Sequence, residues 1–353
     1  MAFIRSCLYA LSAVPALTIA TQSQDLQKRD SIIAASLRDT VSALQLGATN
    51  ALTTVPVGIV DWLSGAGPHA IYGNINNYGT ILISQTDALT TPSGDGVQWQ
   101  GTSTDGSLRN FAGSSFILND ASASTPSTYN LILSSLENNG TMQLCGPVGS
   151  AINLWCNSAD CYNGGLIVFE QVRGSANTAS MYFRNEVQAA APAAQNIINN
   201  GGVLMRSARV DFTQNILGTG CYMMSNSAVM FLQSGVGTNQ NTAGTPALNG
   251  QSIYFVDGTA AMHIEQGVYS GISSTFGPRL YNFGAGNAIE FAQTITAVTY
   301  SAVTGLVTVN LGVSNTLNIL VGAGYVPTGF IIGSHDGLSF DDSCLCDTPS
   351  GSV

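Results

Sequence analysis

The chain has 353 residues, of which 45% are hydrophobic and only 8% are charged, against roughly 25% charged in an ordinary soluble protein. Its 39 glycines are in excess and its 11 prolines are few, which excludes collagen-like and proline-rich sequences. The net charge of -10 argues against binding to the phosphates of nucleic acid or to an anionic membrane surface.

The N-terminus predicts secretion. Residues 1–20 carry one charge, Arg5, ahead of an apolar run from Cys7 to Ile19, which is typical of a secretory signal peptide. The apolar run is shorter than the roughly 20 residues that span a bilayer. We therefore expect no membrane span in the mature chain.

A dibasic pair, Lys28-Arg29, follows the signal peptide. It predicts a processing site at the end of a propeptide, residues 21–29, with Asp30 as the mature N-terminus. An incidental exposed pair is the alternative. The mature chain would hold no lysine, seven arginines and nineteen acidic residues, for a net charge of -12.

The cysteines predict disulfides. Removal of the signal peptide leaves an even number, which in an oxidising compartment indicates up to three disulfides, with the pairing left open. The candidates are Cys145, Cys156, Cys161, Cys221, Cys344 and Cys346. Their spacing lacks the paired C-x2-C of a structural zinc site, so we expect neither a metal nor another cofactor.

One N-x-[ST] sequon, Asn139-Gly140-Thr141, is present. In a secreted chain it makes Asn139 a candidate glycosylation site on an exposed turn.

Residues 30–62 differ in pattern from the rest of the chain. Their apolar residues Ile33, Leu37, Val41 and Leu44 recur at spacings of four, four and three. This spacing predicts one helix. We expect this helical segment to cap the N-terminal end of the domain that follows.

Residues 63–292 consist of short β-prone runs between turns rich in Gly, Asn and Ser, which predicts an all-β domain. In a weak repeat, an Asn-Asn-(x)-Gly turn precedes a β-run; its glycines Gly79, Gly140 and Gly201 are 61 residues apart. Because Asn and Gly accept the left-handed conformation of tight corners, the repeat favours a parallel β-helix with several coils per repeat. A β-sandwich with asparagine-rich hairpins is the alternative.

Residues 293–343 alternate apolar and polar side chains at hairpin spacing, which predicts an antiparallel module packed on the end of the solenoid. Such a cover would protect the open strand edge. Residues 344–353 are expected to form a tail.

Candidate catalytic residues are few. Glycoside hydrolysis needs two carboxylates roughly 5–9.5 Å apart, and the candidates are Asp257 and Glu265, with His263 near the second. We interpret Asp341-Asp342 as a solvated acidic pair and His335-Asp336 as a turn. The sequence holds no G-x-S-x-G motif, no P-loop and no complete dinucleotide fingerprint. We therefore expect that the protein is not an enzyme.

Five stretches follow one another in a characteristic order: Ala70–Ser84, Gly218–Cys221, Val256–Ile264, Thr304–Val309 and Leu320–Phe330. The first contains Asn-Ile-Asn-Asn-Tyr-Gly ahead of a β-run, and the last contains Gly-Ala-Gly-Tyr ahead of Phe330. In this order they resemble the N-terminal domain of the fungal hyphally regulated cell wall protein family, a group of yeast cell-wall adhesins. The resemblance covers about residues 55–345.

The resemblance implies a right-handed parallel β-helix followed by a smaller β-sandwich-like module, acting as the ligand-presenting head of an adhesin without catalytic residues. The sequence departs from the family in its helical segment, residues 30–62. It also lacks the family's Ser/Thr-rich stalk and C-terminal anchor signal. We therefore expect a secreted head, or a fragment of a longer wall-anchored protein.

The function we expect is that of a secreted adhesin of the fungal cell wall or cell surface, which adheres to host, cell or abiotic surfaces. Its expected partners are cell-wall or host-surface glycans or proteins, or abiotic surfaces. A charge-poor exterior of Asn, Ser, Thr and aromatic side chains suits hydrogen bonding and stacking. The candidate contact aromatics, each more often structural, are Tyr72, Tyr78, Trp99, Trp155 and Tyr162. The alternatives are a polysaccharide-active β-helix enzyme, a structural wall component and an ice-binding protein, which would need a regular threonine ladder.

Overall fold

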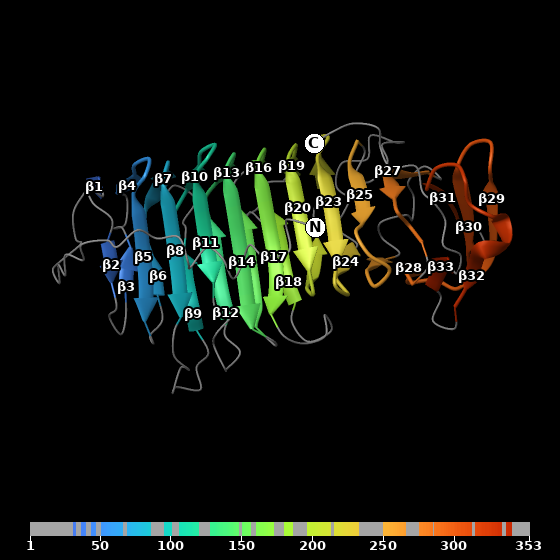
Figure 1. The fold of residues 1–353 in the computed structure, drawn as a ribbon, viewed down its shortest axis with the longest axis horizontal. Coiled ribbons are helices and arrows are strands. Elements are labelled where there is room, and N and C mark those ends of the chain that lie inside the picture. Colours follow the sequence, from blue (N-terminus) through green and yellow to red (C-terminus); the bar gives the residue numbers. More distant parts are fainter. Residues whose placement is uncertain are drawn as a thin grey trace, which may run out of the picture.

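The computed structural model describes most of the chain between residues 31 and 340 (Figure 1). The described residues are 31–32, 37–39, 44–46, 51–65, 69–85, 95–100, 106–119, 128–147, 150–156, 160–172, 180–185, 196–212, 215–232, 250–265, 275–284, 286–312, 315–333 and 337–340. The predicted signal peptide, propeptide and C-terminal tail lie outside these residues, and so do Lys28-Arg29, Cys344 and Cys346.

The chain winds into a β-solenoid whose coils stack side by side along one long axis (Figure 1). Each full coil gives one short strand to each of three sheets, called here A, B and C, and pairs in parallel with the coils before and after it. Along most described strands, buried apolar residues alternate with half-buried polar ones. One face of each sheet therefore lines a common core.

Sheet A has eight strands: β1 (Ser31–Ile32), β4 (Leu52–Val55), β7 (Asn74–Asn77), β10 (Leu108–Asn110), β13 (Leu136–Asn138), β16 (Asp160–Asn163), β19 (Asn196–Asn199) and β22 (Asn215–Leu217). Sheet B runs in the order β2 (Leu37–Asp39), β5 (Val60–Gly65), β8 (Thr80–Gln85), β11 (Ser115–Asn119), β14 (Thr141–Pro147), β17 (Leu166–Val172), β20 (Gly202–Arg206), β23 (Cys221–Ser225), β25 (Ser252–Phe255), β27 (Thr275–Tyr281), β31 (Asn315–Leu320), β30 (Leu306–Leu311) and β29 (Ile295–Ser301). Sheet C runs in the order β3 (Leu44–Leu46), β6 (His69–Ile71), β9 (Asp95–Gln100), β12 (Thr128–Leu133), β15 (Ala151–Cys156), β18 (Ser180–Asn185), β21 (Arg209–Phe212), β24 (Val229–Leu232), β26 (Ala261–Ile264), β28 (Ala288–Phe291), β33 (Gly337–Phe340) and β32 (Phe330–Ile332).

The helix predicted within residues 30–62 is wrong for the part of this segment that the structure describes. Strands β1, β2 and β3 occupy it and pair in parallel with β4, β5 and β6 of the next coil. Leu37 and Leu44, which fitted the helical spacing, fall in two different strands. Pairing with the next coil satisfies the backbone groups on one edge of each of these strands, and this tertiary contact overrides a weak local preference.

A ladder of buried asparagines runs along the corner where sheet A meets sheet B. Its five members end consecutive sheet-A strands and are at most 1% exposed: Asn77, Asn110, Asn138, Asn163 and Asn199. Each Nδ2 donates to the Oδ1 of the next asparagine at 2.8 Å, and the last donates to Gln251 Oε1 at 3.0 Å. The ladder satisfies polar groups that would otherwise be orphaned in the core.

A stack of small residues follows the ladder at the same corner and explains the sequence repeat. Backbone hydrogen bonds between coils place its members in the order Gly79, Ser114, Gly140, Gly165, Gly201 and Gly220. The 61-residue spacing therefore corresponds to two coils. At Gly201, an added Cβ would overlap the carbonyl oxygen of Gly165 in the coil before, so close backbone approach demands glycine here.

The C-terminal strands reverse direction but stay in the solenoid sheets. Strands β29, β30 and β31 form an antiparallel meander, and β31 joins it to β27 in sheet B. In sheet C, β33 pairs antiparallel with both β28 and β32. The two sheets meet where Tyr300 packs on Tyr325, just before the 3-10 turn η1 (Pro327–Gly329), and on Phe330 of β32.

Candidate interaction surface

Asp257, one of the candidate catalytic carboxylates, lies at a tight corner of the solenoid. Its carboxylate accepts the backbone N–H of Asn226 at 2.7 Å and that of Thr259 at 2.9 Å. The hydroxyl of Thr259 in turn accepts the backbone N–H of Ser227 at 2.7 Å. Asn226 and Ser227 have φ of 55° and 62°, a strained left-handed pair that the next coil fixes in place. These bonds indicate a structural role for Asp257.

The hydrogen bonds of the Asp257 carboxylate predict a contribution to folding stability that is lost at acidic pH. Desolvation raises the pKa of Asp257, but the hydrogen bonds from the Thr259 hydroxyl and from the N–H groups of Asn226 and Thr259 outweigh it, so that the pKa is lowered overall. A carboxyl with a lowered folded pKa stabilises the fold above its unfolded pKa, about 3.9, and this stability is lost as the pH falls through the folded pKa.

We therefore expect the melting temperature of the wild-type protein to fall more steeply than that of Asp257→Asn as the pH drops below about 4. Thermal unfolding of both proteins over a pH series would measure the difference. Parallel curves for the two proteins would contradict the proposed clamp.

His263, the candidate histidine next to Glu265, lies among aromatic and charged side chains on the outer face of sheet C. His263 stacks flat on Phe231 with ring centres 4.2 Å apart, and its Nδ1 lies 3.4 Å from Glu290 Oε2. The guanidinium carbon of Arg209 lies over the Phe231 ring, 4.0 Å from its centre. Phe231, His263 and Glu290 therefore form a row along the outer face of sheet C, with one residue from each of three adjacent coils.

Of the other described candidate acids, Asp257 lies at the corner described above and Glu265 directly follows the end of β26, so neither is part of this row. The described positions include no group of three His, Cys, Asp or Glu side chains arranged to hold a metal ion. His335-Asp336 and Asp341-Asp342 lie outside the described residues, and the side chain of His69 is not described.

The described arginine side chains are already engaged within the chain. Arg109 lies 3.5 Å from Glu137, and the guanidinium of Arg206 lies 3.6 Å from Glu170. Arg209 binds Asp211 at 2.8 Å, while Arg279 lies over the Tyr281 ring at 4.9 Å. Three of these four arginines therefore have a carboxylate that offsets their charge, and the Arg109 side chain remains 60% exposed.

The candidate contact aromatics separate by burial. Trp99 is fully buried, whereas Trp155 and Tyr162 are half-buried. Tyr72 and Tyr78 are 36% and 38% exposed. Tyr78 stacks on Phe111 of the next coil at 4.0 Å, so part of its ring surface is used inside the protein.

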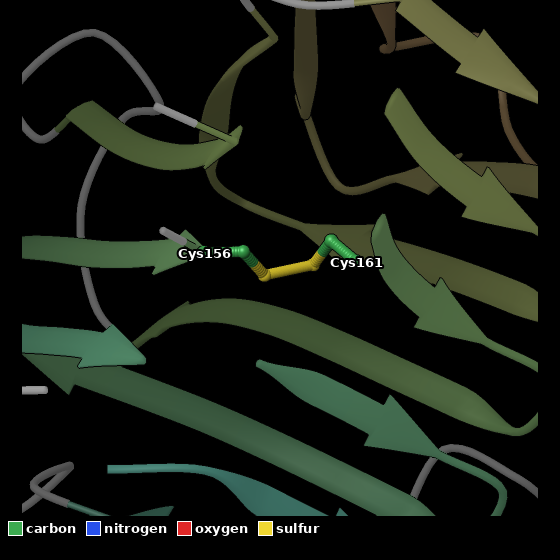
Figure 2. Close-up of a disulfide and its surroundings, with 2 residues drawn as sticks. All are labelled: Cys156 and Cys161. Atoms are coloured by element: carbon green, nitrogen blue, oxygen red, sulfur yellow. A yellow bond between two sulfur atoms is a disulfide. The ribbon is translucent and has the colours of Figure 1, made fainter. Parts of the chain in front are cut away.

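The predicted cysteines give one disulfide within the described part of the chain, Cys156–Cys161 (Figure 2). It joins the end of β15 to β16 and is buried. Cys145 and Cys221 are thiols, and Cys145 Sγ donates to Glu170 Oε2 at 3.8 Å. They lie on β14 and β23, three strand spacings apart in sheet B, or about 14 Å, which is too far for a disulfide between them.

A surface at the C-terminal end of the solenoid, which we call the neutral end, was not predicted from the sequence. No Asp, Glu, Lys or Arg occurs between Glu290 and Asp336, a stretch that includes β29–β32. The exposed large apolar side chains of its described part are Val303, Val326, Ile331 and Ile332, at 96%, 47%, 41% and 43%. The charge-free run is visible in the sequence and could have indicated this surface.

Comparison with known proteins gives one family. The family model described as hyphally regulated cell wall protein, N-terminal, matches residues 68–343, most of the chain. This match confirms the resemblance inferred from the five sequence stretches. No curated protein matches the chain. Among the described residues, we find no helix with the length and apolar character needed to cross a membrane.

Proposed function

Because the chain belongs to the hyphally regulated cell wall protein family and is a protein of the cell wall or cell surface, we propose that it acts there as an adhesin-like head. In this proposal the neutral end contacts an uncharged, apolar surface of a neighbouring cell or substratum. No catalytic step is involved. The single observation that carries the proposal is the charge-free segment whose apolar side chains face solvent.

The burial pattern supports this assignment. The aromatic side chains of the neutral end turn inward, where the Tyr300 hydroxyl donates to the carbonyl of Gly322 at 2.9 Å. Ile331 and Ile332 of β32, by contrast, are more than 40% exposed. Exposed apolar side chains that lie together mark an interaction surface, and Ile331 and Ile332 are consecutive in β32.

The charge distribution supports a neutral partner. The mature chain predicted from the sequence would be strongly acidic, so anionic surfaces would repel it. The neutral end contributes no charge to that repulsion. Contact through this end would depend on apolar burial, which salt does not screen, rather than on ion pairs.

The test is adhesion of the full secreted chain to polystyrene beads, compared with the double variant Ile331→Thr, Ile332→Thr. Threonine keeps the β-branched shape, and we expect the apparent affinity to fall about tenfold because apolar contact area is lost. Val57→Thr is the matched control, since Val57 is 80% exposed between β4 and β5. We expect its binding to equal that of the wild type.

Two further measurements separate this proposal from its alternatives. Binding that persists at high salt, together with no binding to beads that carry sulfated polysaccharide, is expected. Release of soluble sugar from wall polysaccharides during the same incubations would favour the polysaccharide-active enzyme instead. Equal binding by the wild type and the double variant would remove the neutral end as the contact surface.

A further inference from the structure

Asn139 of the sequon lies on the outer side of the corner between sheets A and B. It follows the ladder residue Asn138, and its backbone N–H donates to the carbonyl of Asn110 at 2.7 Å. Its side chain is half-buried and points away from the ladder, since Nδ2 donates to Glu137 Oε1 at 3.1 Å. The side chain of Glu137 is 44% exposed. The Asn139 amide is therefore held in a fixed place at the protein surface.

An aromatic ring of the next coil lies beside this amide. A Cβ added to Gly164 would come within 2.7 Å of Asn139 Oδ1, 2.8 Å of the Tyr162 hydroxyl oxygen and 2.9 Å of a Tyr162 ring carbon. Both side chains therefore occupy the space over Gly164 that a larger residue would fill. Asn139 Oδ1 and the Tyr162 oxygen can be at most about 5.5 Å apart, the sum of their two distances.

The register explains how the two residues meet. Strand β13 pairs with β16 so that Glu137 lies opposite Tyr162, on the outward row of sheet A. The hydrogen bond from Asn139 to Glu137 therefore directs Nδ2 toward the row that holds the Tyr162 ring. A sugar attached to Nδ2 would begin next to an aromatic ring that is already ordered by the fold.

We propose that Asn139 carries an N-linked glycan and that the first N-acetylglucosamine packs its C–H face on the ring of Tyr162. In the transfer step, Nδ2 forms a bond to the sugar C1 as the bond from C1 to the phosphate of a lipid-diphosphate-linked oligosaccharide breaks. The lipid diphosphate leaves, and the transferring enzyme's base takes one Nδ2 proton. Contact between polarised C–H groups and the negative ring face then stabilises the sugar's position.

The modification itself is tested on the full chain secreted from a eukaryotic host. Enzymatic release of N-glycans in isotopically heavy water should convert Asn139 to labelled aspartate, detected by mass spectrometry of peptides. Thr141→Ala should abolish the label, and Thr141→Ser should keep it. An unlabelled Asn139 peptide from the wild-type protein would overturn the proposal.

The role of Tyr162 is tested in three backgrounds by comparing glycosylated protein with unglycosylated protein, which is secreted while synthesis of the lipid-linked oligosaccharide is inhibited, so that Asn139 keeps its amide. In the wild type, absence of the glycan should lower the melting temperature by about 2 °C through the lost sugar–ring contact. Tyr162→Ala should abolish that difference, whereas Tyr72→Ala, the matched control at an exposed tyrosine elsewhere, should keep it. An equal difference in the Tyr162→Ala and wild-type proteins would remove Tyr162 as the sugar's contact.

Discussion

Replacement of Asn138 by alanine is expected to lower the free energy of unfolding by about 3–5 kcal/mol, since it interrupts the buried ladder at its middle member. Asn138 Oδ1 accepts from Asn110, while its Nδ2 donates to Asn163 Oδ1 at 2.8 Å and to the carbonyl of Leu166 at 3.2 Å. The substitution would leave these buried groups without those bonds, and each such group costs roughly 1–3 kcal/mol.

Asn153→Ala is the matched control for this prediction. Asn153 also donates from Nδ2 to an asparagine of the neighbouring coil, Asn130 Oδ1, at 2.6 Å. It lies on the outward face of sheet C and is half-buried, so water can replace the lost bond. We expect a loss of no more than about 1 kcal/mol, measured by denaturant unfolding beside Asn138→Ala. Similar losses for the two variants would contradict a special role for the buried ladder.

Gly201→Ala is expected to destabilise the solenoid by about 3 kcal/mol or to prevent its folding. The new Cβ would overlap the carbonyl oxygen of Gly165, which itself accepts the N–H of Gly202 at 2.8 Å. Because the Cβ is bonded directly to the backbone of one coil and the oxygen belongs to the backbone of the coil before, the overlap can be relieved only by separating those coils. That movement would weaken the hydrogen bonds between β17 and β20.

The control for Gly201 is Gly284→Ala, where an added Cβ would meet only the Asn282 carbonyl oxygen at 3.8 Å. We expect its stability to stay within about 0.5 kcal/mol of the wild type. Yield from secretion and thermal unfolding would compare the two variants. A Gly201→Ala protein that melts with the wild type would show that the corner has more room than the structure indicates.

The features that the sequence by itself determined, the all-β class and the stacked coils, depend on residues that are neighbours along the chain. Short β-prone runs between Gly-rich and Asn-rich turns are sufficient to indicate an all-β chain, because strand and turn preferences depend on neighbouring residues. The Asn-Asn-(x)-Gly turns indicated stacked coils for the same reason. The family could also be identified from the sequence, since its short motifs follow one another in order within the matched residues 68–343.

Only the tertiary structure decided which residues meet. Successive hydrogen-bonded ladder partners are separated by 33, 28, 25, 36 and 52 residues. Single coils differ in length, so the 61-residue repeat marks only every second coil and does not identify the partners in the coils between. Pairing between coils also overrode the helical spacing of apolar residues within residues 30–62, and it brought Tyr162 next to Asn139. Contacts between coils, rather than local preferences, fix these placements, because the backbone and side-chain groups of each coil find their partners in the next.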